Sequence, residues 1–314
     1  MKAKFTNSVN VRGYLFSTDR LEKRTSQKGV EYIGGTINIA TDEDALNVVP
    51  VNFTYVTPTY KSGNPNTTYQ LLESIINGET KTYEAVGKDA ARVRVDGDIE
   101  VNDWVNRDGE AIASRRIRGS FVHLLNANET FGANPAHFEA DMLIQSVVSK
   151  EPADGSEYLT LNGFVFNFRG EVLPVNFSVS SAPGMQFFEN QDISSSDPYF
   201  GKVWGDIKST VVTTATEQDD SEVGFGAPTV QTSSRTFRTW EVSGANVNLG
   251  LDDSTITMDE LKAAMESRTK ALADVRARYE ARANSGNAFG GAASVPAATA
   301  APKAKAVSPA DFKF

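Results

Sequence analysis

Residues 48–56 read VVPVNFTYV, and residues 172–180 read VLPVNFSVS, 124 positions later. Three further stretches recur in the same order: KGVEYIGGTINIA at 28–40 with DGSEYLTLNGFVF at 154–166, VDGDIE at 95–100 with VWGDIK at 203–208, and SRRIRGSFV at 114–122 with SRTFRTWEV at 234–242. Self-similarity of this kind indicates repeated structural units. The sequence therefore predicts that the chain contains one module twice.

Each copy has the pattern of five short strands, in which apolar residues alternate and turn residues mark the ends. The predicted strands are 9–17, 30–40, 47–56, 92–103 and 111–124 in the first copy, and 138–149, 157–168, 171–180, 201–213 and 230–243 in the second. Between the third and fourth strands of the first copy, TTYQLLESIINGE has helical spacing. This arrangement favours an OB-type Greek-key barrel, with a generic β-sandwich as the alternative.

Composition and charge limit the class of protein. The chain has 314 residues, 40% of them hydrophobic and 23% charged, which is typical of a globular protein with room for two domains. It contains neither an apolar run of the ~18 residues that suggest a membrane span nor an N-terminal signal pattern, so a cytoplasmic location is expected. The net charge of −9 disfavours non-specific coating of duplex DNA.

Enzyme chemistry has little material in this sequence. There is no cysteine, and the only histidines are His123 and His137. No G-x-x-x-x-G-K-[ST] signature is present. Asp42, Glu43 and Asp44 could hold a hard cation, but a turn between strands explains them as well. The sequence therefore predicts a protein that is not an enzyme and needs no cofactor or metal.

One hairpin of the first copy carries an unusual aromatic residue. In VDGDIEVNDWVNRDG, residues 95–109, a tryptophan precedes an acidic-glycine turn. With GVEYIGGTINIAT and VVPVNFTYV before it, this hairpin resembles the bacterial and phage single-stranded DNA-binding protein family over most of residues 9–125. Val95, Asp96, Gly97 and Ile99 match that family's strand, and Trp104 falls at its aromatic position.

The resemblance implies an OB fold and a base-stacking role for Trp104. Stacking of a base on an aromatic ring is worth about 1–3 kcal/mol and is independent of sequence, because every base has a π-face. The alternative is that the ring folds back over the barrel as an apolar cap. The second copy aligns Val212 with Trp104 and lacks this platform, whereas Trp204 and Trp240 lie in strands, where one could be core and the other surface.

Basic and aromatic side chains also interleave on other predicted strands, as a groove that follows a phosphate backbone requires. Alternation places Arg12, Tyr14 and Phe16 on one face of the first strand, and Arg116 and Arg118 on one face of the fifth. The second copy offers Arg235 and Arg238. Solvated charges on edge strands are the alternative. The candidate nucleic-acid-binding residues are Trp104, Arg12, Tyr14, Phe16, Arg116, Arg118, Arg235 and Arg238.

The C-terminal region is organised differently. TMDELKAAMESRTKALADVRARYEAR opens with a capping box, Thr257 to Glu260, and predicts a helix over 257–284. This helix either docks on a barrel or pairs with another chain, and dense charge on both flanks favours pairing. The following linker is rich in alanine, glycine and proline and is too poor in large apolar residues to fold. It ends in DFKF, which resembles in part the family's protein-recruiting tip, here Asp311, Phe312 and Phe314; a frayed terminus is the alternative.

Together these features predict two OB-type barrels, residues 1–127 and 134–247, then a helix at 257–284 and a disordered linker and tip at 285–314. We expect sequence-independent binding and protection of single-stranded DNA in phage replication or recombination, by a homo-oligomer that recruits replication or recombination proteins through its tip. The alternatives are an interaction protein that has kept the barrels without nucleic-acid binding, and a metal enzyme that depends on Asp42 or Asp44.

Overall fold

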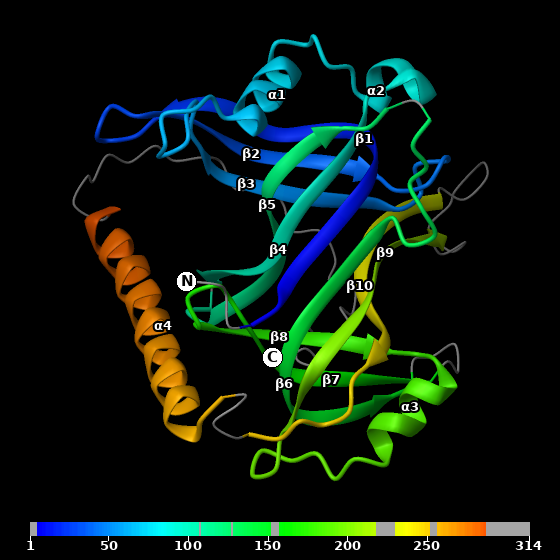
Figure 1. The fold of residues 1–314 in the computed structure, drawn as a ribbon, viewed down its shortest axis with the longest axis vertical. Coiled ribbons are helices and arrows are strands. Elements are labelled where there is room, and N and C mark those ends of the chain that lie inside the picture. The colour runs from blue at the N-terminus through cyan, green and yellow to red at the C-terminus, as the bar shows by residue number, and fades with distance from the viewer. Residues whose placement is uncertain are drawn as a thin grey trace, which may run out of the picture.

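The computed structural model describes residues 5–106, 108–126, 128–151, 157–217, 230–251 and 256–286, and for 210–217, 230–237 and 282–286 it describes the backbone alone. Figure 1 shows two strand-rich bodies side by side, with one long helix along a flank of the molecule. Within the described residues, no helix is both long and apolar enough to cross a membrane.

The first body is a closed five-stranded barrel. Its strands are β1 (Asn7–Thr25), β2 (Glu31–Ala40), β3 (Val48–Val56), β4 (Arg92–Val105) and β5 (Ala111–Leu124). They pair in the order β2-β3-β5-β4-β1, and β1 also pairs with β2, which closes the barrel. Helix α1 (Thr67–Ile76) lies between β3 and β4, followed by the short α2 (Tyr83–Val86) and the 3-10 turn η1 (Gly87–Asp89). This is the Greek-key arrangement of an OB barrel.

The second body repeats that connectivity. Strands β6 (Ala136–Lys150), β7 (Tyr158–Phe166), β8 (Val172–Val179), β9 (Tyr199–Glu217) and β10 (Val230–Ala245) pair in the order β6-β7-β8-β10-β9, and β6 also pairs with β9. Helix α3 (Ala182–Glu189) occupies the place of α1. The predicted fold class, two OB-type Greek-key barrels followed by a C-terminal helix, is confirmed.

Local sequence explains the two main helices. The Asn66 side chain accepts hydrogen bonds from the backbone N–H groups of Thr68 and Tyr69 and so caps α1, whose buried face includes Leu72 and Ile75. Helix α4 (Met258–Gly286) opens with the predicted capping box: Glu260 N donates to Thr257 Oγ1 at 3.1 Å, and Thr257 N donates to Glu260 Oε2 at 3.0 Å.

The first strand is longer than the sequence indicates. It continues to Thr25 instead of ending near residue 17, because β1 and β2 extend together beyond the barrel as a hairpin. A register shift between Asp19 and Glu22 bends this hairpin at Arg20, whose φ is 51°. Gly35 faces the bend with a φ of 142°, and a Cβ there would lie 2.3 Å from the Arg20 carbonyl oxygen. Only glycine fits at this contact.

The two barrels are joined by antiparallel pairing of β1 with β6. Val9 lies opposite Phe138 in this pairing, and it lies opposite Gly97 of β4 in its own barrel. Phe138 lies opposite Gly205 of β9, and the Gly-Asp-Ile repeat makes Gly205 the equivalent of Gly97. Val9 and Phe138 are therefore equivalent residues that face each other, and an approximate twofold axis passes through this pair.

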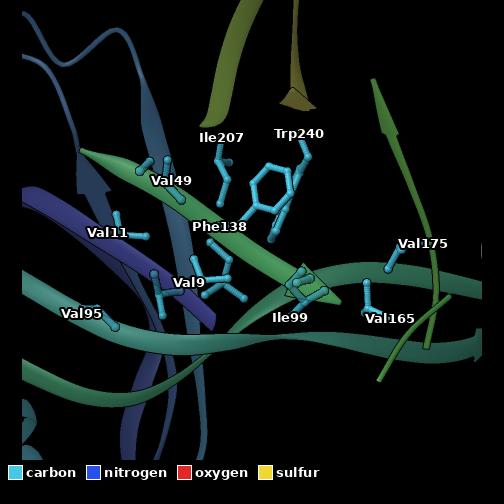
Figure 2. Packing of buried hydrophobic residues seen from close by; sticks show 14 of the residues in the cluster. Val9, Val11, Val49, Val95, Ile99, Phe138, Val165, Val175, Ile207 and Trp240 are labelled. Atoms are coloured by element: carbon cyan, nitrogen blue, oxygen red, sulfur yellow. The ribbon is translucent and has the colours of Figure 1, made fainter. Parts of the chain in front are cut away.

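The hydrophobic core is continuous across this seam. Phe138 is fully buried, with its ring centroid 4.7 Å from that of Phe177 and 5.2 Å from that of Trp240. Figure 2 shows side chains of both barrels, among them Val9, Val11, Phe138 and Trp240, gathered in one cluster. The barrels therefore share apolar packing as well as backbone hydrogen bonds.

The hydrogen-bond register corrects one equivalence inferred from the repeat. Gly97 pairs with Gly119 of β5, and its equivalent Gly205 pairs with Val242 of β10. Equivalent residues of β5 and β10 are therefore 123 positions apart. The sequence match of 114–122 with 234–242 implies an offset of 120 instead. The two offsets differ by three residues, and a shift by an odd number of residues moves each side chain to the opposite face of the strand. Arg238 is consequently the equivalent of Arg115. The two segments share alternating charge and apolarity, and such a pattern matches itself at several offsets.

We expect Phe138→Ala to lower the free energy of unfolding by about 3–5 kcal/mol, because the lost ring is packed from both barrels. Urea unfolding followed by circular dichroism measures this change. Phe121→Ala removes a ring that is 45% exposed and is expected to cost no more than about 0.5 kcal/mol. Equal losses in the two variants would contradict a core that crosses the seam.

Candidate nucleic-acid interface

The β4–β5 hairpin presents Trp104 to solvent. The ring is 45% exposed, and Nε1 donates to Ser114 Oγ on the neighbouring strand at 2.9 Å. The hairpin closes at the predicted acidic-glycine turn, where Gly109 has a φ of 83° and donates its N–H to the Asn106 carbonyl at 3.1 Å. Trp104 is therefore an oriented surface ring with a satisfied indole N–H, which does not pack into the core as a cap would.

The other face of the same hairpin is held by helix α4. Arg268 Nη1 donates to Asp103 Oδ2 at 2.6 Å, and both side chains are only 14% exposed. Near the start of α4, Leu261 is buried in a small cluster with Phe166 and Phe200 of the second barrel. The helix thus docks on both barrels. Two of its large apolar side chains, Met258 and Tyr279, are exposed, at 65% and 41%.

The two predicted arginines of β5 are paired with carboxylates of β4. Arg116 Nε donates to Glu100 Oε2 at 2.8 Å, and Arg118 Nε donates to Asp98 Oδ1 at 3.0 Å. Burial raises the pKa of Asp98, and the hydrogen bond to Asp98 raises the pKa of Arg118. These cross-strand pairs neutralise one another, so the outer face of the hairpin is less cationic than the sequence pattern indicates.

The predicted residues of β1 belong to a separate aromatic cluster. Tyr14 packs against Phe131, at 5.0 Å between ring centroids, and against Tyr83 at 5.6 Å; Phe16 packs on Tyr83 at 5.9 Å. Arg12 Nε donates to Asn10 Oδ1 at 3.1 Å. All of these rings are half-buried.

The aromatic cluster of β1 lies far from Trp104 along the sheet. Tyr14 faces Arg92 at the beginning of β4, whereas Trp104 lies near the end of that strand. Twelve residues of strand separate the two positions, about 40 Å along the chain path. The structure therefore does not gather the predicted residues at one point, and both sites could contact one strand only if that strand spans the barrel.

Sequence reasoning missed one exposed aromatic pair. Tyr32 of β2 and Tyr55 of β3 lie 4.5 Å apart between ring centroids, and Tyr55 is 52% exposed. Strands β2 and β3 form the face with which OB folds bind oligonucleotides. Tyr32 has an equivalent in the second copy, Tyr158, which is typical of a residue that serves the fold, and no sequence signal distinguishes Tyr55 from a core residue.

A cleft of about 710 Å³ lies between the barrels. Its described lining contains three arginines, Arg115, Arg116 and Arg238, and no carboxylate. Two of the five arginines predicted from the sequence, Arg116 and Arg238, thus line the same cleft. Arg115 was missed because alternation from Arg116 and Arg118 places it on the opposite face of β5, towards the interior.

Arg115 is a half-buried cation in the lining of this cleft. Its Cζ lies 4.7 Å from the Trp240 ring centroid and 5.4 Å from that of Phe177, and Nη1 donates to Asn176 Oδ1 at 3.2 Å. Burial lowers the pKa of Arg115 to about 9, so the guanidinium is still protonated at neutral pH. Of the other tryptophans, Trp240 is buried core and Trp204 is half-buried against Gly244.

The possible cation site at Asp42 and Asp44 is a turn. Asp42 Oδ1 accepts the backbone N–H groups of Asp44 at 3.0 Å and Leu46 at 2.9 Å, which is a turn between β2 and β3. The side chain of Arg235 and the whole tip, Asp311, Phe312 and Phe314, lie outside the residues whose side chains the structure describes.

Fold and surface define a two-barrel OB-type protein that carries an exposed aromatic hairpin. The sequence matches the YorF family over residues 6–278, and the chain belongs to that family. No curated protein matches the sequence.

Two solved structures of the single-stranded DNA binding protein from Thermus aquaticus are similar in shape. The wild type has a TM-score of 0.43 and 13% identity, with 77% of this chain and 93% of that chain covered. A deletion mutant has a TM-score of 0.44 and 14% identity, with 78% and 95% covered. Values this low do not transfer the function of those proteins to this chain.

We expect Asp103→Asn to free α4 from the hairpin, because it leaves the Arg268 guanidinium largely buried without a counter-charge. Amide hydrogen exchange in α4 and in the end of β4 is expected to become at least about tenfold faster. The matched control is Glu43→Gln, which breaks the exposed ion pair with Lys88 and should change exchange little. Unchanged exchange in Asp103→Asn would show that α4 is held by other contacts.

Proposed function

We propose that this protein binds single-stranded DNA without sequence preference, with Trp104 as a base-stacking platform. The observation that carries the proposal is the exposed Trp104 ring on the β4–β5 hairpin of an OB barrel. Hairpins and loops at this end of the barrel are where OB folds hold oligonucleotides. The Ser114 hydrogen bond satisfies the indole N–H, so a base can cover the ring without leaving a buried donor unpaired.

Stacking contributes more to this proposal than charge. Arg116 and Arg118 are already paired with carboxylates, and a phosphate must compete with Glu100 and Asp98 for them. A site with few free cations releases few counterions, which makes the salt dependence of binding shallow. The bases of a duplex are stacked on one another and cannot stack on Trp104, so we expect weak binding of duplex DNA. The net charge of −9 also disfavours it.

The finer parts of the proposal rest on the sequence. The barrels comprise residues 1–127 and 134–247 and derive from duplication of one module, and the protein acts without catalysis. It protects single strands in the cytoplasm of a bacterial host during phage replication or recombination, as a homo-oligomer. The terminal Asp311, Phe312 and Phe314 recruit partner proteins from the end of the linker.

We expect Trp104→Ala to weaken binding of a fluorescein-labelled oligothymidine by about 5- to 150-fold, the equivalent of about 1–3 kcal/mol for one stacked base. Fluorescence anisotropy titration measures the dissociation constant. Tyr279→Ala removes a ring of similar exposure on α4 and is expected to bind as the wild type does. Equal affinities of Trp104→Ala and the wild type would place the DNA elsewhere on the protein.

We expect the wild type to show tryptophan quenching with oligothymidine and none with a duplex of equal charge, measured at low and at moderate salt. The binding constant derived from quenching should fall as salt is added. The slope of its logarithm against the logarithm of the salt concentration should be shallow, because only a few counterions are released. Absence of quenching at low salt, together with a stable homo-oligomer, would favour a protein-interaction role for the barrels.

A further inference from the structure

The cleft between the barrels is built around their approximate twofold axis. Three pairs of equivalent residues line it from opposite sides: Pro50 with Pro174, Asn52 with Asn176, and Arg115 with Arg238. The first two pairs follow from the Pro-Val-Asn-Phe repeat, and the third from the strand register. Each barrel thus contributes the same three groups to one cavity.

The two equivalent arginines carry charge that no described side chain balances. Arg116 is neutralised by Glu100, whereas neither Arg115 nor Arg238 forms an ion pair with any carboxylate in the described part of the chain. Burial lowers the pKa of both guanidinium groups. Partial desolvation of a cation without a counter-charge is unfavourable, more so for the half-buried Arg115 than for the exposed Arg238, and an anion in the cleft would remove that cost.

The remaining lining suits a nucleotide. Asn52, Asn162 and Asn176 supply amide donors and acceptors, and Phe164 and the two prolines supply apolar surface. The volume of about 710 Å³ lies in the range of pockets that enclose one small ligand. A planar guanidinium is the side chain best matched to phosphate.

The cleft also leads towards the aromatic cluster of β1. A second hollow, of about 270 Å³, is lined by Phe16, Asn38, Ser209 and Arg238, so Arg238 borders both spaces. Arg238 of the second barrel and Phe16 of the first thus line the same second hollow, next to the cleft.

We propose that the cleft binds one nucleotide of a DNA single strand, with its phosphate between Arg115 and Arg238, and that the strand crosses from one barrel to the other at this point. The proposal rests on single-strand binding as the proposed function. It assigns a binding role to Arg115, which sequence alternation had placed in the interior, and gives the second barrel, which lacks an equivalent of Trp104, a place in the same site.

Trp240 offers a local reporter of this site, since its ring contacts Arg115. The double variant Trp104→Phe/Trp204→Phe leaves it as the single tryptophan among the three of the chain. In the full-length double variant, we expect oligothymidine and thymidine 5′-monophosphate to change the Trp240 emission up to a saturating value. Thymidine, which has no phosphate, is expected to leave the emission unchanged.

Substitution of the arginines tests the assignment. Arg238→Gln, at an exposed position, is expected to shift the emission titration at least tenfold to higher oligothymidine concentration, and Arg115→Met is expected to do the same. Arg238→Gln keeps the test valid if Arg115→Met does not fold. Arg278→Gln, an equally conservative change on the exposed face of α4, is the matched control and should leave the titration unchanged.

The outcomes separate this inference from the proposed function. If oligothymidine binds the wild type by anisotropy while Trp240 emission and the Arg238→Gln affinity stay unchanged, the cleft site is wrong and single-strand binding stands. A response to thymidine 5′-monophosphate without one to oligothymidine would assign the cleft to a free nucleotide and overturn the strand path. An equal response to thymidine would overturn the role of phosphate.

Discussion

The structure depends on one antiparallel pairing, that of β1 with β6 about the Val9–Phe138 pair. Because these two residues are equivalent in their barrels, the pairing relates the barrels by an approximate twofold rotation. The same rotation brings equivalent residues of the two barrels to opposite sides of the seam. Phe138 packs with Phe177 and Trp240 beneath the seam, and Arg115 of the first barrel covers the same aromatic cluster from above.

The twofold relation explains why equivalent residues of separate barrels meet in one cleft. In a single barrel, Arg115 would point to an open side of the sheet, where water would solvate it. The second barrel removes that water and supplies Trp240, Phe177 and Asn176 in its place. Cation–π contact and the two oxygens of Asn176, backbone and side chain, replace part of the lost hydration, and no described carboxylate supplies a counter-charge.

Electrostatics divide the basic residues into two groups. Arg116, Arg118 and Arg268 each have a carboxylate partner and serve mainly to fix β5, the hairpin and α4. Arg115 and Arg238 have none among the described side chains and lie in the cleft. A net charge of −9 is thus compatible with a locally cationic groove, because the described lining of the cleft contains arginines and no carboxylate.

Much of the architecture was determined by the sequence alone. The repeats predict two barrels, because copies of one module share a fold. Alternation predicts the ten strands within a few residues, except at the end of β1, and Thr257 with Glu260 predicts the start of α4, because these two signals depend on neighbours a few positions apart along the chain. For Trp104 the sequence predicts a place on a hairpin but leaves a stacking platform and an apolar cap as alternatives, and the structure exposes the ring. Only the tertiary structure decided which arginines are paired, that Arg115 is equivalent to Arg238, and that Tyr55 reaches the surface. The pairs of Arg116 with Glu100 and of Arg118 with Asp98 depend on the register of β4 against β5. The pairing of Arg268 with Asp103 and the equivalence of Arg115 with Arg238 join residues more than 100 positions apart. A local pattern contains no information about register or about such distant contacts.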